Sequence, residues 1–215
     1  MAISLINNLS MNRSDTAVAD QVWTATSATL SDFQATGGPG LTFLARETSS
    51  GVSTTSFDGY FTSDYTNYIV YFSDWSPAVD SNQQFVIRQS DSDVTSTDYQ
   101  SSGQGNQRAA GANTSMPSGG FGEAFGRLSY QDTDGASNFT CAGNIVIYNP
   151  LGTTDYKNFT VNFLSHGDTG SNYLYCWIGT NYFDGNTSAM SGITFKASSG
   201  NHDGVFDLYG IKNSA

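Results

Sequence analysis

The last stretch of the chain constrains the fold most, because it predicts two strands in immediate succession. Apolar-rich runs cover residues 193–197 and 205–211, and a polar connection of Ser, Gly, Asn, His and Asp separates them. This pattern is typical of a hairpin whose loop is longer than two residues. Gly210 interrupts the second run, and a glycine inside an apolar strand indicates a bulge or a close backbone approach.

The same segment carries a resemblance. Residues 191–212 run from Ser-Gly-Ile through Ser-Gly-Asn to a closing Leu-Tyr-Gly-Ile-Lys, and looser matches cover 57–88 and 143–150. In these blocks the chain resembles β-sandwich structural proteins of tailed bacteriophages, a class of shell decorations, head fibres and tail-fibre modules. The resemblance implies a virion protein at the surface of the phage particle, assembled in the host cytoplasm. Residues 1–43 carry no such resemblance.

Composition and periodicity predict an all-β fold of one domain over residues 21–215. The 23 Gly against 4 Pro, with 13% aromatic residues, suit many short strands joined by turns. We expect an antiparallel two-sheet β-sandwich of jelly-roll type with about ten strands, since no interval shows the helical pattern that a parallel crossover needs. The predicted strands are 22–26, 41–46, 68–72, 84–88, 124–130, 144–148, 158–164, 172–178, 193–197 and 205–211. The first two of these are expected to be adjacent.

Two intervals lie outside this strand pattern. Residues 1–20 form either a first strand with a loop or an arm that anchors the protein through Ile3, Leu5, Ile6 and Leu9. Residues of about 90–120 are rich in Ser, Gly, Gln and Asn, and they predict a long polar loop. The alternative for that interval is a pair of short edge strands.

Charge and apolar content exclude two classes of partner. The formal net charge is −11, so a phosphate backbone would be repelled and nucleic-acid binding is not expected. No run approaches the 18 or so apolar residues that cross a bilayer, and no membrane partner is expected.

The two cysteines, Cys141 and Cys176, are too few for a disulfide framework. Cys176 shares a strand face with Leu174 and Ile178, which favours burial as a small apolar residue. A bridge between the two cysteines is the alternative, although a phage protein folds in a reducing cytoplasm.

The sequence offers little for catalysis, and we expect no enzyme. The two Glu, Glu47 and Glu123, lie 76 positions apart, whereas a glycoside hydrolase needs two carboxylates across one bond. His166 and His202 lie in polar turn-like sequences without a Gly-x-Ser-x-Gly elbow.

Calcium is the one cofactor for which a pattern exists. Asp132, Asp134 and Asn138 place oxygen ligands around Gly135, as calcium loops do, but the closing Glu of an EF-hand is missing. The alternative is that these residues serve turn geometry alone.

Aromatic residues near polar segments suggest contact with a glycan or with another subunit. Trp75, Tyr99, Tyr182 and Phe183 are the candidates, because sugars stack on aromatic rings and hydrogen-bond to neighbouring polar groups. The same residue types are enriched at subunit interfaces.

Together these features predict a non-enzymatic virion component, an outer capsid decoration that binds and stabilises the assembled head. Its partners would be the major capsid protein or other virion proteins, and it would form a homo-oligomer, with a trimer as the symmetry expectation. The alternatives are a tail-fibre or head-fibre module that binds host surface glycans, or a free lectin-like module.

Overall fold

The computed structural model describes residues 21–25, 31–35, 40–109, 112–129, 132–135, 140–167 and 173–212. The chain divides into two compact units, Met1–Pro39 and Gly40–Asn213. In the first unit, β1 (Gln21–Ala25) pairs antiparallel with β2 (Ser31–Ala35). The predicted pairing of residues 22–26 with 41–46 is therefore wrong, because a nearer segment closes a shorter loop at a lower entropy cost.

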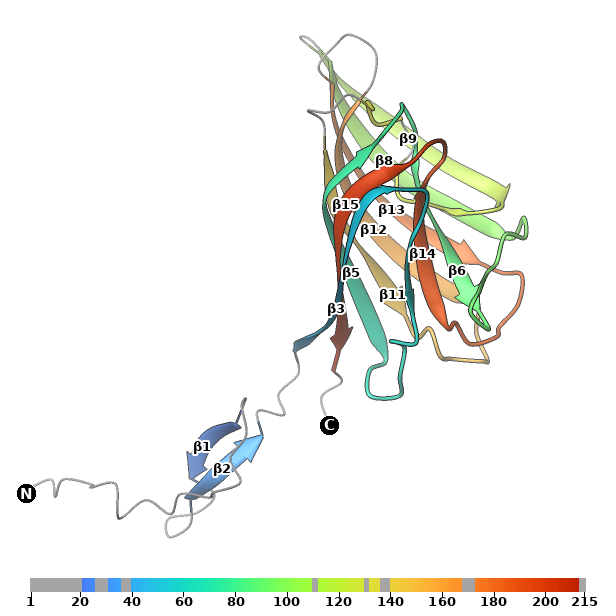
Figure 1. Cartoon of the computed structure of the whole chain (residues 1–215). Helices are drawn as coiled ribbons and strands as arrows, with labels where there is room; N and C mark the ends of the chain where they lie inside the picture. The colour runs from blue at the N-terminus through green and yellow to red at the C-terminus, as the bar shows by residue number, and fades with distance from the viewer. Residues whose placement is uncertain are drawn as a thin grey trace, which may run out of the picture. The chain divides into compact units, whose positions relative to one another are not determined.

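The second unit is an antiparallel β-sandwich, which confirms the predicted fold class. Its described residues form thirteen strands in two packed sheets, compared with about ten strands expected for the whole chain. The larger sheet has eight strands in the order β3, β15, β5, β11, β12, β13, β8, β9 (Figure 1). Their bounds are β3 (Leu41–Val52), β5 (Asn67–Pro77), β8 (Tyr99–Ala109), β9 (Ala112–Glu123), β11 (Cys141–Tyr148), β12 (Lys157–Gly167), β13 (Tyr173–Phe183) and β15 (His202–Ile211).

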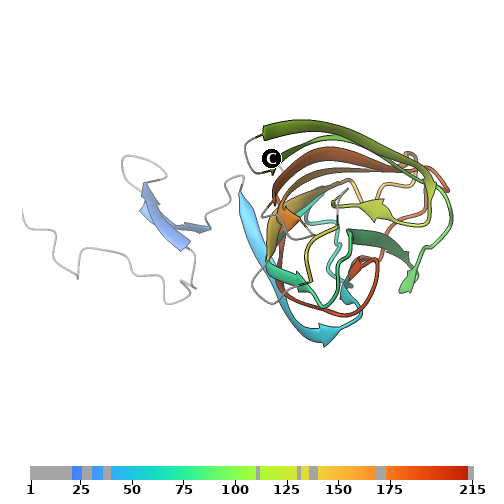
Figure 2. The ribbon, with the colours of Figure 1, turned by 90° about the horizontal axis from the view of Figure 1, so that it is seen from above.

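The smaller sheet has five strands. Its order is β10, β6, β14, β4, and β7 pairs with the C-terminal end of β6. The bounds are β4 (Thr55–Asp58), β6 (Gln83–Gln89), β7 (Ser92–Asp93), β10 (Gly126–Arg127) and β14 (Gly192–Ala197). Seen from above, the strands curve around the core rather than lying in flat layers (Figure 2).

The terminal segment joins the two sheets instead of forming a hairpin. Both predicted strands exist, but β14 pairs with β4 and β6 whereas β15 pairs with β3 and β5. Because successive strands cross from one sheet to the other in this way, the connections are of jelly-roll type. The close approach predicted at Gly210 is present, since a Cβ there would lie 2.5 Å from the ring of Tyr65.

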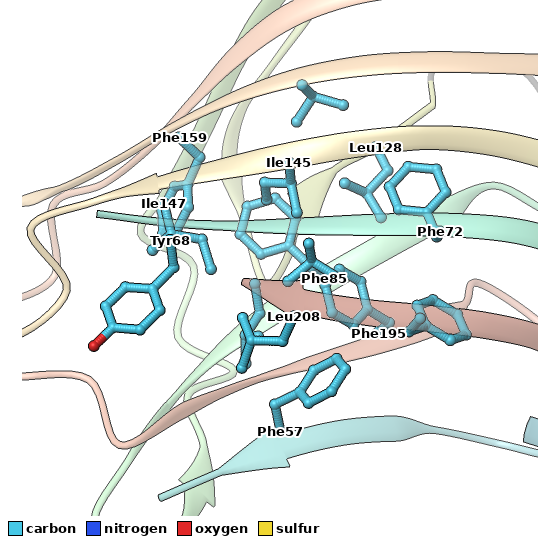
Figure 3. Close-up of a cluster of buried hydrophobic side chains, with 14 of the residues drawn as sticks. Phe57, Tyr68, Phe72, Phe85, Leu128, Ile145, Ile147, Phe159, Phe195 and Leu208 are labelled. Carbon is cyan, nitrogen blue, oxygen red and sulfur yellow. The ribbon is translucent and has the colours of Figure 1, made fainter. Parts of the chain in front are cut away.

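The core is aromatic and receives side chains from both sheets (Figure 3). Phe85 of the smaller sheet packs against Phe159 of the larger one, with ring centroids 4.9 Å apart. Phe195 stacks on Phe206 at 5.3 Å across the same interface. Burying a side chain of this size contributes roughly 2–3 kcal/mol each, so these rings hold the sheets together.

The interval at about 90–120 is not a long polar loop, and it matches the alternative of two strands at the sheet edge, except that these strands are long. It contains β8 and β9, which pair with each other over eleven and twelve residues and extend the larger sheet at one edge. Every residue from Tyr99 to Arg108 has a partner on β13. Sequence propensity is weak here, and pairing with the neighbouring strand overrides it.

Candidate functional site

The outer face of the eight-stranded sheet, the side turned away from the core, is the most distinctive surface of the molecule. Among the described residues, twelve large apolar side chains are exposed, and eight of them lie on this face. These eight are Leu41, Phe43, Tyr71, Phe121, Tyr148, Leu164, Leu174 and Ile178. Monomeric proteins seldom expose apolar side chains in such groups, and larger patches mark interaction sites.

The outer face also lacks charge over most of its width. Strand register places four successive rows of outward-pointing positions across β11, β12, β13, β8 and β9, and we call these the neutral rows. The members whose side chains are described are, row by row from one end to the other, Tyr148, Asn158, Tyr182, Gln100, Phe121; Val146, Thr160, Thr180, Ser102, Gly119; Asn144, Asn162, Ile178, Gln104; and Ala142, Leu164, Cys176, Asn106, Ser115. None of these positions is acidic or basic, in a chain with 19 acidic residues and a net charge of −11.

One part of the neutral rows is apolar. Leu164, Cys176 and Ile178 lie on neighbouring strands, and with Leu174 they form what we call the apolar patch. Ile178 is 61% exposed. A shallow hollow of about 360 Å³ opens among these side chains, with Asn162 at its border. The hollow is therefore bordered mainly by apolar side chains.

A second hollow, of about 450 Å³, lies nearer the β9 edge. Phe121 and Tyr182 flank it, and the small residues Ser102, Gly119 and Gly120 form much of its lining. Phe121 is 84% exposed, an unusual setting for a phenylalanine. This hollow therefore combines aromatic rings with hydroxyl and amide groups.

The opposite end of the face, on β3, β15 and β5, carries an aromatic ladder. The ring of Tyr209 contacts those of Phe43 and Tyr71 edge-on, at centroid distances of 5.5 and 5.8 Å. Beside it Arg46 pairs with Asp207 at 2.6 Å. The hydrogen bond from Arg46 lowers the pKa of Asp207, so this pair stays ionised and adds no net charge.

Three of the four predicted aromatic contact residues are wrong. Trp75, Tyr99 and Phe183 are all buried and belong to the core cluster, where no glycan or subunit reaches them. Alternation along β8 and β13 turns Tyr99 and Phe183 inward. Trp75 reaches the core because the register of β5 shifts after Phe72, where Asp74 has a φ of 50°. The Tyr99 hydroxyl donates to the Val94 carbonyl at 2.7 Å and accepts the Ile87 amide at 3.0 Å. Desolvation raises the pKa of Tyr99, which keeps this hydroxyl neutral.

Tyr182 is the predicted contact residue that lies on the outer face. Its ring packs edge-on against Tyr156, with centroids 5.6 Å apart. Two important neighbours, Phe121 and Ile178, were not predicted. Phe121 stands between Gly120 and Gly122, and a lone aromatic residue bracketed by glycines in a polar interval is a signal that could have identified it.

The cysteines are free and lie on opposite sides of the sheet. Cys141 is buried and Cys176 is exposed, so the predicted burial of Cys176 is wrong. Cys176 does share a face with Leu174 and Ile178 as expected, but that face is the outer one. Desolvation raises the pKa of the Cys141 thiol to about 12, although a hydrogen bond to Thr133 opposes the shift.

The calcium hypothesis gains no support from the described residues. They contain no group of three or more His, Cys, Asp or Glu that could hold a metal ion. Asp132 accepts a hydrogen bond from the Asn82 side chain, and the backbone of Asp134 donates to the His166 carbonyl. Asn138 lies outside the described residues, so the predicted site itself stays a prediction. The anchoring residues Ile3, Leu5, Ile6 and Leu9 lie outside them as well.

Two of the side chains weighed for catalysis, Glu123 and His202, make structural contacts within the chain. Both carboxylate oxygens of Glu123 accept hydrogen bonds from Arg127. His202 is buried at the start of β15, not in a turn, and its Nε2 is hydrogen-bonded to the Thr55 hydroxyl at 2.8 Å. Burial lowers the pKa of His202 to about 4, partly opposed by Asp203, and the imidazole is neutral at pH 7.

No protein-family model, no curated protein and no solved structure matches this chain. In the part of the chain that the structure describes, there is no helix long and apolar enough to cross a membrane. The functional argument therefore starts from the outer face itself.

Proposed function

We propose that this chain is a non-enzymatic structural component of a tailed-phage particle, which binds other particle proteins through the outer face of its eight-stranded sheet. In its most specific form, the protein is an outer decoration of the head and stabilises the assembled shell. The observation that carries the proposal is the apolar patch of Leu164, Leu174, Cys176 and Ile178, which borders on and extends into rows without charge.

An uncharged apolar face suits burial against another protein. Interface centres are depleted of charged residues, because a charge that loses its water without a partner costs several kcal/mol. The acidic residues elsewhere on the chain, with a net charge of −11, disfavour association through any other surface. In this proposal, contact with another protein is therefore directed to the outer face of the eight-stranded sheet.

The resemblance of residues 191–212 to phage β-sandwich proteins supplies the class of partner. These residues include β14 and β15, the two strands that join the sheets, so the resemblance covers the centre of the fold. A protein that binds only the assembled shell shifts the assembly equilibrium towards it. In this proposal the partner is the major capsid protein or another virion protein, and copies of the chain associate as a symmetric oligomer such as a trimer.

Copy number tests the proposal directly. Quantitative mass spectrometry of purified particles measures this chain against the major shell protein. A ratio of one, or a simple fraction of it, is expected for a decoration spread over the shell. A few copies per particle would overturn the decoration role and place the chain at the tail or a vertex. Absence from the particle would overturn the phage assignment.

A charged substitution in the apolar patch tests whether the protein attaches to particles through the outer face. Leu164→Asp should abolish association with particles, because the new carboxylate would be buried without a partner. Val79→Asp is the matched control, since both side chains are 45% exposed and Val79 lies outside the outer face. Both variants should remain folded by circular dichroism. Equal loss of association in the two variants, or in neither, would contradict attachment through the patch.

A further inference from the structure

One of the neutral rows alternates aromatic and amide side chains across five adjacent strands. The residues are Tyr148, Asn158, Tyr182, Gln100 and Phe121, on β11, β12, β13, β8 and β9, and we call them the aromatic–amide row. Strands β13, β8 and β9 lie side by side at one edge of the sheet (Figure 1). Neighbouring strands are about 4.8 Å apart, so successive rings along the row are roughly 10 Å apart.

The hollow of about 450 Å³ lies at the end of this row that is formed by β13, β8 and β9. Phe121 and Tyr182 stand on either side of Gln100, and Gly119 and Ser102 lie in the next row. Because glycine and serine project little, they leave a recess between the two rings. The recess is large enough for a small polar ring compound, with aromatic surface at both ends and hydrogen-bonding groups beneath it.

Two side chains that line the hollow, Tyr182 and Gln100, are held in place by contacts within the chain. Tyr182 leans on Tyr156, with an interplanar angle of 81°. The Gln100 amide nitrogen donates to the Asp184 carboxylate, which fixes the amide and leaves its carbonyl oxygen as an acceptor. Preorganised side chains lose little rotamer entropy on binding, so contacts at this row would translate into affinity.

A β-bulge lies directly after Phe121. On β9 the register with β8 shifts between the pairs Tyr99–Glu123 and Gln100–Phe121, and the extra residue is Gly122 with φ of +69°. Bulges re-aim side chains at the edges of sheets, and Glu123, the residue after this bulge, pairs with Arg127. Phe121 itself keeps the outward alternation of Ser115 and Gly119 along β9, so it is 84% exposed at the rim of a polar hollow, where burial would have been favoured.

Taken together, we infer that the aromatic–amide row binds a neutral glycan. The apolar C–H faces of sugar rings stack on aromatic side chains, and amide and hydroxyl groups pair with sugar hydroxyls. A spacing of roughly 10 Å between rings is comparable to the length of a disaccharide unit in an extended chain. The row has no cation for an acidic glycan, and the net charge of −11 repels anions.

This site is separate from the apolar patch. The aromatic–amide row contains no aliphatic side chain, whereas the patch has no aromatic ring. The inference rests on the row alone and does not depend on a phage origin. A glycan site and a protein-binding patch can therefore fail independently in experiment.

The test begins with the full chain on an array of neutral oligosaccharides, including glucans, mannans, galactans and N-acetylglucosamine oligomers, with acidic glycans as comparison. We expect binding to extended neutral oligosaccharides, with a Kd that is unchanged between low and high salt. Binding confined to acidic glycans and lost at high salt would overturn the inference. Failure to bind any neutral member of the array would overturn it as well.

Variants then locate the site by calorimetric titration with the best array member. Phe121→Ala and Tyr182→Ala should each weaken binding roughly five- to tenfold, as expected for loss of one aromatic stacking contact. Phe43→Ala is the control, because Phe43 is an exposed aromatic residue on the same face but outside the row. Unchanged affinity in both row variants, or an equal loss in the control, would contradict the assignment. The patch variant Leu164→Asp should bind the glycan normally.

Discussion

The outward faces of the two sheets differ in how they use charge. On the five-stranded sheet, Arg88 reaches Asp58 at 2.7 Å and Asp93 at 2.5 Å, and also contacts the Thr194 hydroxyl. Val86, at the centre of that outward face, is buried. On the eight-stranded sheet, four rows across β11, β12, β13, β8 and β9 carry no charge and leave apolar side chains in solvent.

The difference indicates which sheet is available to a partner. On the smaller sheet Arg88, Asp58 and Asp93 are paired within the chain, so a ligand at that place would have to displace existing ion pairs. The larger sheet presents groups that a partner can cover without removing a charge from water. We call the outward face of the smaller sheet the closed side and the outer face of the larger sheet the open side. If this comparison holds, substitutions on the closed side should change the free energy of unfolding, whereas substitutions on the open side should not.

The largest expected contrast lies between two consecutive residues of β12. Phe163 points into the core and is 3% exposed, whereas Leu164 belongs to the apolar patch on the outer face. Phe163→Ala should reduce the free energy of unfolding by about 3–5 kcal/mol through lost burial and a cavity. Leu164→Ser should change it by less than about 0.5 kcal/mol. Urea denaturation measures both, and a large effect of Leu164→Ser would mean that the outer face is covered by the chain itself.

Acid should destabilise the fold through His202, which is buried between the two sheets and therefore differs from the exposed outer face. Burial lowers the pKa of His202 to about 4 in the folded state from 6.5 in the unfolded chain. The unfolded state then binds more protons between these pH values, so stability is full above pH 6.5 and falls as the pH drops towards 4. The loss is about 3 kcal/mol if the full pKa difference is realised.

Denaturant titrations between about pH 7 and pH 4.5 measure this loss. His202→Gln, which can keep a hydrogen bond to Thr55 but cannot titrate, is the matched variant. Its stability should vary less with pH over this window. The same slope in both proteins would refute the assignment to His202.

Sequence patterns located strands well where alternation is strong. In residues 158–164 apolar and polar side chains alternate, which predicts that Phe159, Val161 and Phe163 share the core side, and all three are buried. Partners were harder to predict. Residues 193–197 and 205–211 are strands as expected, yet each pairs with strands far away in the chain, and no local pattern distinguishes such an arch from a hairpin.

The site was harder to predict than the fold, for two physical reasons. Both faces of β13 are apolar, so alternation could not decide that Trp177 is buried while Cys176 and Ile178 are exposed. The strands β8 and β9 consist largely of residues with low strand propensity, and they form because the sheet pairs them. Phe121 was therefore missed, since its strand was not expected.

Arg88 should matter more to stability than its counterpart on the open face. Arg88→Met removes two ion pairs and the contact with Thr194, and we expect a loss of about 1–2 kcal/mol after allowing for the partial exposure of Asp58 and Asp93. Arg46→Met removes the pair with Asp207 on the larger sheet, where Arg46 is well exposed. It should give no measurable change. Thermal unfolding of the two variants compares them, and an equal or larger loss for Arg46→Met would reverse the comparison between the faces.

The last prediction concerns the bulge at Gly122, which follows Phe121 on β9. Gly122 has φ of +69°, a left-handed conformation in which a Cβ costs about 1–2 kcal/mol. Gly122→Ala should therefore lower the free energy of unfolding by about 1 kcal/mol, and Gly122→Asn by less, because asparagine tolerates this conformation better. A Cβ at this position meets nothing nearer than the Thr97 carbonyl at 3.7 Å, so any loss reports backbone conformation and not a clash. Urea denaturation of the two variants gives the ranking. If Gly122→Ala were as stable as the parent chain, the backbone would not be left-handed here, and the register shift between β8 and β9 would need another cause than a bulge at Gly122.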